Sequence, residues 1–202
     1  NITVETLEHK KKYWENLLYT IREKRSKPRL DDKCLTSWNA IMGKGFVEAY
    51  KALGNPKYLD IALQNANFIT KNLWSAEGHL LRTYKNGKAT INAYLEDYAH
   101  VIQGFIALYE ATLDEHWLQN AKQLTDYSFD HFYDEKAEFF SFTSKTDEAL
   151  ITTHFEVEDN VIPAANSVMA SNLFRLSIYF NNPYYENIAE QIVQNIIPSI
   201  DY

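Results

Sequence analysis

The chain has 202 residues, 46% hydrophobic and 14% aromatic, so it is long and apolar enough to bury a core and is not a disordered segment. Its 27 acidic and 20 basic residues give a formal net charge of −7, which argues against nucleic-acid binding. The single cysteine, Cys34, excludes an internal disulfide and a cysteine-based metal cluster, and no apolar run reaches the ~20 residues of a membrane span.

The first element expected in chain order is a helix over residues 4–24, ahead of Pro28. Its lysines and arginines alternate with Glu15 and Glu23, a pattern typical of a solvated helix face rather than of a phosphate-binding stripe. Cys34 follows, and we interpret it as a buried apolar residue, because no histidine is close to it in sequence to activate a thiolate.

A helical hairpin that begins near Trp38 is the unit from which the rest of the chain is built. Its first helix carries apolar residues at helical spacing as far as Leu53, and Gly54-Asn55-Pro56 then starts a second helix. A second copy follows at a constant offset, at which Ala40, Gly45, Phe46, Tyr50, Leu59 and Ala62 meet Ala99, Gly104, Phe105, Tyr109, Leu118 and Ala121. A third copy follows at a larger constant offset, at which Asn39, Pro56, Tyr58, Ala62 and Ile69 meet Asn166, Pro183, Tyr185, Ala189 and Ile196.

Glycines stand at an equivalent place in the first two copies, Gly45 and Gly104, in the middle of the first helix. A glycine there costs about 1 kcal/mol relative to alanine. We interpret both as points where a neighbouring helix approaches closely, with close approach of a ligand as the alternative.

The connections between hairpins are long, unequal and partly β. Residues 79–84 precede the turn signal Asn86-Gly87, and residues 138–143 and 150–155 form a second candidate strand pair. A linear solenoid has short, regular connections, whereas a ring of hairpins can extend its loops around one mouth. The sequence therefore predicts an all-α fold, a partial (α/α) toroid with short β-hairpin connections, forming a single domain over residues 1–202.

Polar residues gather where the first helix of each hairpin begins, and the repeat places all three clusters at one end of the ring. Carboxylates, amides and aromatic faces around one mouth are what a sugar-binding cleft needs. The candidate catalytic residues are Asp32, Glu96, Asp97 and Asp159. The candidate substrate-binding residues are Asp31, Lys33, Trp38, Asn39, Tyr98, His100, Asn166 and Ser167.

Several chemistries remain open for these clusters. A glycosidase would use two of the carboxyl groups, one protonated and one ionised. An epimerase would use paired bases, for which His100 and His154 are conceivable. Helix capping alone is the structural alternative, since Asp, Asn and Ser accept hydrogen bonds from free N–H groups at helix starts. No metal-ligand spacing, phosphate loop or dinucleotide fingerprint is present, so we expect no cofactor and no metal.

The same clusters resemble a known family. Residues 29–39 (RLDDKCLTSWN), residues 95–99 (LEDYA), and Asp159 with residues 162–168 (IPAANSV) are similar to the spermatogenesis-associated, thioredoxin-domain-containing proteins. That family joins a thioredoxin-like domain to an (α/α)6 toroid similar to those of six-hairpin glycosidases and N-acylglucosamine 2-epimerases. The resemblance implies that this chain is the later part of the toroid, without the thioredoxin-like domain and the early hairpins.

These observations lead to two functional hypotheses. The first is a fragment of a carbohydrate-processing or carbohydrate-binding domain, glycoside hydrolase-like or sugar epimerase-like if active. The second is a non-catalytic helical scaffold or protein-interaction module. In either case we expect a cytoplasmic protein that takes no nucleic acid or membrane as partner, that packs with the remainder of its parent toroid, and that self-associates through exposed helix faces.

Overall fold

A computed structural model describes residues 3–148 and 151–199 and divides the chain into two units, Asn1–Asp32 and Lys33–Tyr202. The first unit contains helix α1 (Val4–Glu23), which confirms the helix expected over residues 4–24. Thr3 caps it, since the Thr3 hydroxyl accepts a hydrogen bond from the Thr6 amide at 3.3 Å.

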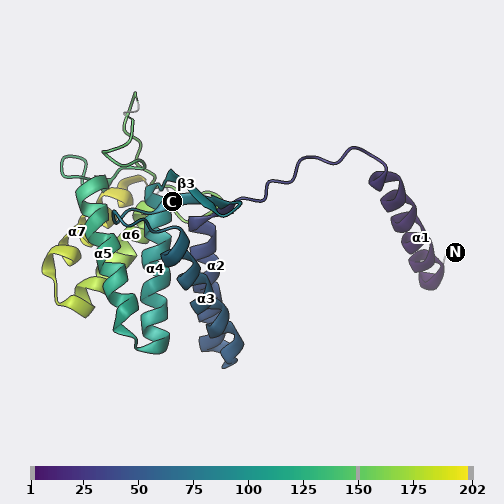
Figure 1. Cartoon of the computed structure of the whole chain (residues 1–202), viewed down its shortest axis with the longest axis horizontal. Helices are drawn as coiled ribbons and strands as arrows, with labels where there is room; N and C mark the ends of the chain where they lie inside the picture. The colour runs from purple at the N-terminus through teal and green to yellow at the C-terminus, as the bar shows by residue number, and fades with distance from the viewer. Residues whose placement is uncertain (1–2, 149–150, 200–202) are drawn as a thin grey trace. The chain divides into compact units, whose positions relative to one another are not determined.

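The second unit consists of three helical hairpins, as the repeat predicts. They are α2 (Thr36–Leu53) with α3 (Pro56–Asn72), α4 (Leu95–Thr112) with α5 (Glu115–Phe132), and α6 (Ala165–Phe180) with α7 (Pro183–Ile196), which runs into the 3₁₀ helix η1 (Ile197–Ser199). We call α2, α4 and α6 the inner helices and α3, α5 and α7 the outer helices. The inner helix α4 packs against α2 on one side and α6 on the other, and each outer helix packs against its own inner helix (Figure 1).

Each hairpin turns through the same two-residue corner, which fixes the register of the repeat. The inner helix ends on a residue in the left-handed conformation, and the next residue caps the outer helix by accepting a hydrogen bond from the amide two positions later. The left-handed residues are Gly54, Leu113 and Asn181, with φ of 67°, 58° and 48°. The capping residues are Asn55, Asp114 and Asn182. Both offsets of the predicted repeat are therefore confirmed at the corners.

The first connection between hairpins forms the predicted β-hairpin. Strand β2 (Leu81–Lys85) pairs antiparallel with β3 (Lys88–Asn92), and Asn86 and Gly87 both have positive φ in the tight turn. A third strand, β1 (Cys34–Leu35), joins the other edge of β2. Cys34 is exposed on this edge strand, so the expectation that it is buried was wrong.

The second expected strand pair was only half right. Strand β5 (Phe139–Phe140) lies in the expected region, but it pairs with β4 (Tyr133–Asp134) and not with residues 150–155. The Asp134 side chain accepts hydrogen bonds from the amides of Lys136 and Ala137, so a tight local turn closes this pair over a short loop. Residues 151–155 form no strand, and Leu150 lies outside the described residues.

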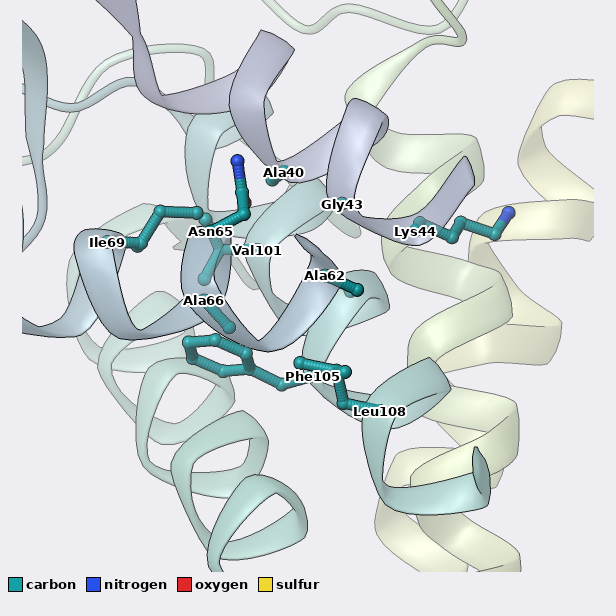
Figure 2. A pocket seen from close by; sticks show the side chains of 11 residues that line it. Ala40, Gly43, Lys44, Ala62, Asn65, Ala66, Ile69, Val101, Phe105 and Leu108 are labelled. Carbon is teal, nitrogen blue, oxygen red and sulfur yellow. The ribbon is translucent and has the colours of Figure 1, made fainter. Parts of the chain in front are cut away.

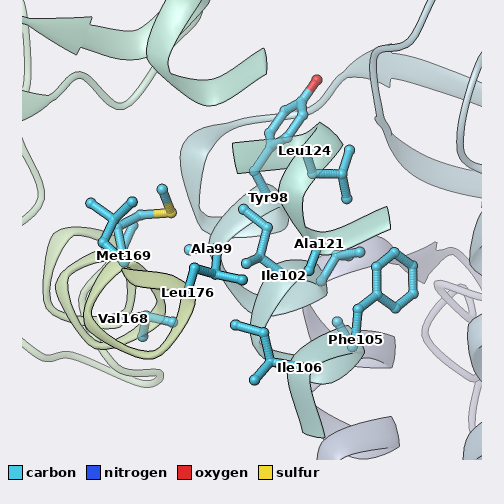
Figure 3. Packing of buried hydrophobic residues seen from close by; sticks show 14 of the residues in the cluster. Tyr98, Ala99, Ile102, Phe105, Ile106, Ala121, Leu124, Val168, Met169 and Leu176 are labelled. Carbon is cyan, nitrogen blue, oxygen red and sulfur yellow. The ribbon is translucent and has the colours of Figure 1, made fainter. Parts of the chain in front are cut away.

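The core is centred on α4, which is buried on both sides. Tyr98 and Phe105 point toward α5, while Ala99 and Ile106 point toward α6 (Figure 3). A β-carbon built on Gly104 would lie 3.6 Å from the Ala40 carbonyl oxygen of α2, which confirms the close approach expected there. None of the described helices is both long and apolar enough to cross a lipid bilayer.

At the far end from the strands, Glu110 of α4 joins all three inner helices. Its carboxylate accepts hydrogen bonds from Arg175, from the Tyr179 hydroxyl at 2.8 Å and from Lys51 Nζ at 3.1 Å. Burial acts to raise the pKa of Glu110, but the hydrogen bonds from Tyr179 and Lys51 and the charge of Arg175 outweigh burial and hold that pKa below its ordinary value. The stabilisation from Glu110 is therefore present above the carboxyl pKa of the unfolded chain and is lost as the pH falls through the lower folded pKa.

We predict that Glu110→Gln lowers the free energy of unfolding by roughly 1 kcal/mol near neutral pH, because this partly exposed carboxylate loses its charge and one acceptor. The loss should shrink as the pH falls from the ordinary carboxyl pKa through the lower folded pKa of Glu110, below which the wild-type carboxyl is also protonated. Urea denaturation at several pH values measures both effects. Glu48→Gln is the matched control, since exposed Glu48 binds Lys51 at 3.3 Å and no other residue among those described. An equal loss in that variant would contradict the role of Glu110 in joining the three inner helices.

Candidate functional site

The start of α4 is organised around the carboxylate of Asp97, which is 0% exposed. One oxygen, Oδ1, accepts a hydrogen bond from the Ser37 amide of α2 at 2.8 Å. The other, Oδ2, accepts from the Tyr94 amide and from Arg82 Nη1, each at 3.0 Å. This single buried group therefore joins the first turns of two inner helices to strand β2. The predicted gathering of Asp97 with the start of α2 is confirmed.

Arg82 connects Asp97 to its neighbour Glu96. Arg82 Nη1 lies 2.5 Å from Glu96 Oε1, and Arg82 Cζ lies 4.6 Å from the centre of the Tyr94 ring. Glu96 is only 8% exposed. Arg82 was not among the predicted residues; the available signal was an arginine in the first strand of the β-hairpin that precedes two consecutive acidic residues at a helix start.

Two carboxyl groups of this region have raised pKa values. Burial raises the pKa of Asp97 to about 6, although the charge of Arg82 and the hydrogen bonds from Tyr94 and Ser37 oppose the rise. Burial and, to a lesser extent, the charge of Glu96 raise the pKa of Glu156, against the hydrogen bond that Glu156 Oε2 accepts from the Ala165 amide at 3.4 Å. Glu156 was not among the predicted catalytic residues, yet it lies close enough to Glu96 and Arg82 for their charges to act on it.

His100 lies one helical turn after Glu96, so the two side chains share a face of α4. It is 2% exposed, and among the described residues neither ring nitrogen has a hydrogen-bond partner of normal geometry. Burial lowers the pKa of His100 to about 4; the charge of Lys44 acts in the same direction, whereas Glu96 and the Pro163 carbonyl oppose it. The imidazole is therefore neutral at pH 7, and its two nitrogens can donate one hydrogen bond and accept another.

Three further predicted residues hold the surrounding loops. The Asn166 amide bonds both backbone groups of Phe140 at 2.9 Å and the Glu156 carbonyl at 3.0 Å. The Tyr98 hydroxyl accepts from the Leu80 amide at 2.8 Å, and the Asn39 amide donates to the Leu35 carbonyl at 2.8 Å. These contacts hold β5, the β1 residue before α2 and the segment before β2 in place.

The other predicted residues are exposed or outside this cluster. Asp159 accepts a hydrogen bond from the Ala164 amide at 2.8 Å, just before α6, while Ser167 and Trp38 are exposed on α6 and α2. Lys33 begins the second unit. Asp31 and Asp32 are the last residues of the N-terminal unit, so a site shared with Asp97 stays a prediction.

A hollow between α2, α3 and α4 lies deeper in the unit and is not a ligand site. Ala40, Gly43, Val101 and Phe105 are among the residues that line it, and its volume of about 10 Å³ holds one water at most (Figure 2). Across the described part of the chain, no group of three or more His, Cys, Asp or Glu side chains is arranged to hold a metal ion.

The contacts of Asp97 predict a large loss of stability on truncation. Asp97→Ala removes one of the two carboxylate partners of Arg82 and leaves the amides of Ser37 and Tyr94 without their acceptor, so we expect the free energy of unfolding to fall by about 3–5 kcal/mol. Asp114→Ala removes an exposed cap from α5 and should cost only about 0.5–2 kcal/mol. Chemical denaturation of both variants tests this difference, and equal losses would show that Asp97 is no more than a cap.

The buried, neutral His100 predicts a pH dependence of folding. Since the folded pKa of about 4 is below the ordinary value of 6.5, its stabilisation is present above pH 6.5 and is lost as the pH falls through 4. The free energy of unfolding of His100→Phe should therefore fall less between these pH values than that of the wild type. The opposite contribution of Asp97 is present in both chains and cancels. Ile102→Val, a buried change on the same helix, should keep the wild-type slope.

Comparison with known proteins identifies the family of this chain. The family model of N-acylglucosamine 2-epimerase (GlcNAc 2-epimerase) matches residues 11–179. Spermatogenesis-associated protein 20 of Homo sapiens is 33% identical over 169 residues, which are 79% of this chain and 22% of the human protein. An uncharacterized protein of Caenorhabditis elegans is 32% identical over 185 residues, 88% of this chain and 25% of that one. The chain thus spans about a quarter of these relatives, and the resemblance inferred from the motifs is confirmed.

Solved structures confirm the toroid. A cellobiose 2-epimerase from Bacillus thermoamylovorans superposes with a TM-score of 0.67 at 16% identity, over 83% of this chain and 45% of that one. A GH76 α-mannanase from Bacteroides thetaiotaomicron also gives 0.67, at 15% identity, over 85% and 46% of the two chains. Such likeness shows a common fold, that of (α/α)6 toroid enzymes. With a family model that covers most of its length, the chain belongs to the N-acylglucosamine 2-epimerase family.

Proposed function

We propose that this fold processes carbohydrate at the N-terminal ends of its inner helices, by proton transfer beside a sugar carbonyl group. The observation that carries the proposal is the buried His100, without a hydrogen-bond partner of normal geometry among the described residues, next to Glu96 on α4. A buried imidazole whose nitrogens lack good hydrogen bonds lowers the free energy of unfolding by about 1–3 kcal/mol, so the presence of His100 at this position calls for a physical reason. A ligand oxygen that bonds to it supplies one.

Epimerisation at C2 of an aldose sets specific chemical demands. The C2 proton is acidic only in the open-chain form, beside the C1 carbonyl, and its removal leaves an enediolate whose charge must be stabilised. Glu156, whose pKa is raised toward neutrality, is suited to act as the base. The Arg82 guanidinium and the neutral His100 imidazole are suited to stabilise the oxyanion.

The remaining predicted residues have supporting roles in this proposal. Asp97 positions Arg82 through its hydrogen bond, and Trp38, which is 57% exposed, offers an aromatic face to a sugar ring. Glu96 and Asp159 remain candidates for a second proton transfer. His100 and Glu96 are nearly inaccessible, so the irregular segment around Pro163 has to move before a sugar reaches them.

One observation favours the alternative of a non-catalytic scaffold. Both oxygens of Asp97 are occupied by Ser37, Tyr94 and Arg82, and the amide of Asn166 is occupied by Phe140 and Glu156. Capping and loop attachment are enough to account for these two residues. A scaffold role does not account for the buried His100, whose ring nitrogens find no hydrogen-bond partner of normal geometry among the described residues.

The proposal predicts exchange of the C2 proton of an N-acylated aminosugar. Incubation of the protein with N-acetylglucosamine in D₂O should replace the C2 proton by deuterium, which proton NMR detects as the loss of one resonance. Glu156→Gln should slow this exchange by about 100-fold or more, because a general base contributes roughly 10²–10⁴-fold. Lys136→Gln, an exposed change on the β4–β5 turn, should leave the exchange rate unchanged.

Sugar contact is measured separately by saturation-transfer NMR with N-acetylglucosamine, mannose and cellobiose. Trp38→Ala should abolish the contact, whereas Leu53→Ala should preserve it, because Leu53 is also exposed (69%) but is the last residue of α2, at the opposite end of that helix from Trp38. Sugar contact without C2 exchange would leave a carbohydrate-binding fold without epimerase activity. The absence of both would support the scaffold.

A further inference from the structure

Helix α4 has one side that is turned away from the three helices packed against it. The residues that contact those neighbours are Asp97 and Gly104 toward α2, Tyr98 and Phe105 toward α5, and Ala99 and Ile106 toward α6 (Figure 3). At 3.6 residues per turn, the remaining side of the helix carries Glu96, His100 and Gln103. We call this side of α4, together with the equivalent side of α2, the inner face.

Lys44 lies on the inner face of α2. The repeat aligns Ser37, Ile41 and Lys44 of α2 with Glu96, His100 and Gln103 of α4. The Lys44 side chain extends out of the hollow between α2, α3 and α4, away from Asn65 and Ala66 (Figure 2). Its charge acts on the His100 imidazole of the neighbouring helix. An ammonium group and the buried imidazole therefore belong to the same surface.

Lys44 is the one cation of the inner helices without an ion-pair partner among the described residues. Lys51 bonds Glu110 at 3.1 Å, and Arg175 bonds the same carboxylate. Glu48 follows Lys44 by four residues, a spacing that allows an ion pair, yet the Glu48 carboxylate bonds Lys51 instead at 3.3 Å. Lys44 is also partly buried, so it has lost some of its hydration without gaining a counter-ion. An anionic ligand would supply that counter-ion.

The inner face is turned toward the centre of the toroid and not toward the next hairpin in the row. In an (α/α)6 toroid the inner helices surround the centre of the ring, and the outer helices lie behind them. Further hairpins of a longer chain continue the row beside α2 and α6, so they do not pack on the inner face of α4. The relative positions of Lys44 and His100 are set by the packing of α2 against α4, within the described chain.

The spacing of the two groups suits a hexose. In the repeat, the position of Lys44 follows that of His100 by three residues, which is about 5 Å along the helix axis. The C6 group of a hexose and its C1–C2 end are separated by a similar distance. A sugar whose carbonyl end lies at His100 therefore brings its C6 group to the level of Lys44.

The charges on this surface favour a carboxylate as the C6 group. Lys44 supplies one positive charge, whereas a phosphate carries nearly two negative charges and is usually held by several cations or by amides at a helix start. Glu96 lies on the inner face beside His100, but Arg82 bonds it at 2.5 Å and compensates its charge. A singly charged anion thus finds one free cation and little repulsion from Glu96.

We propose that the substrate of this site is a hexuronate, whose C6 carboxylate pairs with Lys44 while C1 and C2 lie beside His100. This substrate class rests on the proton transfer proposed above. The base removes the C2 proton, the electron pair of the C–H bond moves toward the C1 oxygen, and a proton returns to the other face of C2. The product is the C2 epimer, and no oxidant or other co-reactant is consumed. Lys44 binds the substrate and takes no part in the proton transfer.

NMR titrations of the intact protein with glucuronate, glucose and glucose 6-phosphate test the substrate class. Glucuronate should bind about 10-fold tighter than glucose or more, because it adds a charge-assisted hydrogen bond. Lys44→Gln should weaken glucuronate binding about 10-fold and leave glucose binding unchanged, whereas Lys44→Arg should keep the preference. Lys57→Gln is the matched control, since it removes an exposed charge from the outer helix α3 and should bind both sugars as the wild type does.

The outcomes distinguish the substrate class from the reaction. Exchange of the C2 proton without a preference for glucuronate, or a preference that survives Lys44→Gln, would overturn the hexuronate and leave the proton transfer intact. Tighter binding of glucose 6-phosphate than of glucuronate would overturn the carboxylate. Glucuronate binding that depends on Lys44 but is not followed by C2 exchange would support the acidic-sugar site and refute the epimerase chemistry. Failure of all three sugars to bind would overturn both.

Chemical denaturation separates substrate binding from a structural role of Lys44. Lys44→Gln should unfold at the same denaturant concentration as the wild type and as Lys57→Gln, because Lys44 has no ion pair to lose among the described residues. A lower midpoint for Lys44→Gln alone would show that Lys44 stabilises the fold through an ion pair, and the hexuronate would then lose its counter-ion.

Discussion

The hydrogen bonds to the buried carboxylate of Asp97 hold together the N-terminal ends of α2 and α4 and strand β2, and the arrangement of the polar cluster depends on them. Its two oxygens receive hydrogen bonds from the first turns of α2 and α4 and from Arg82 of β2. A charge with no exposed surface is tolerated only when every oxygen is engaged in this way. The position of Arg82, and with it the pairing of Arg82 to Glu96, follows from where Asp97 is held. The positions of Arg82 and Glu96 in the polar cluster therefore depend on Asp97.

The candidate residues around Asp97 differ in whether their polar groups are bonded to the backbone. Asp97, Asn166 and Tyr98 are bonded to backbone groups, which explains why they are buried and also limits their chemistry. His100 lies one turn further along the same helix and is buried to a similar degree, yet its nitrogens find no partner of normal geometry in the described residues. A polar group left in this state is where a ligand can gain the most from binding.

Much of this architecture was predictable from the sequence because it is repeated. The corners at Gly54, Leu113 and Asn181, the helix that precedes the repeat and the Asn86-Gly87 turn all follow from local spacing and turn chemistry. The pairing of β4 with β5 was not predictable, because its turn depends on the Asp134 side chain and on Glu138 at positive φ. For the site, the pattern of the helix starts identified Glu96, Asp97 and His100. Arg82 and Glu156 reach the cluster from a strand and an irregular segment, so only the three-dimensional fold brings them near.

The two-residue corner has a consequence for how such molecules diversify. At each corner the helix-ending residue and the capping residue are set by backbone geometry, whereas the connections at the opposite end differ in length and structure from one hairpin to the next. Insertions and deletions in those connections leave the geometry of the corner within each hairpin unchanged. Natural selection can therefore change the loops at one end of the hairpins, residue by residue, while each hairpin keeps its own geometry.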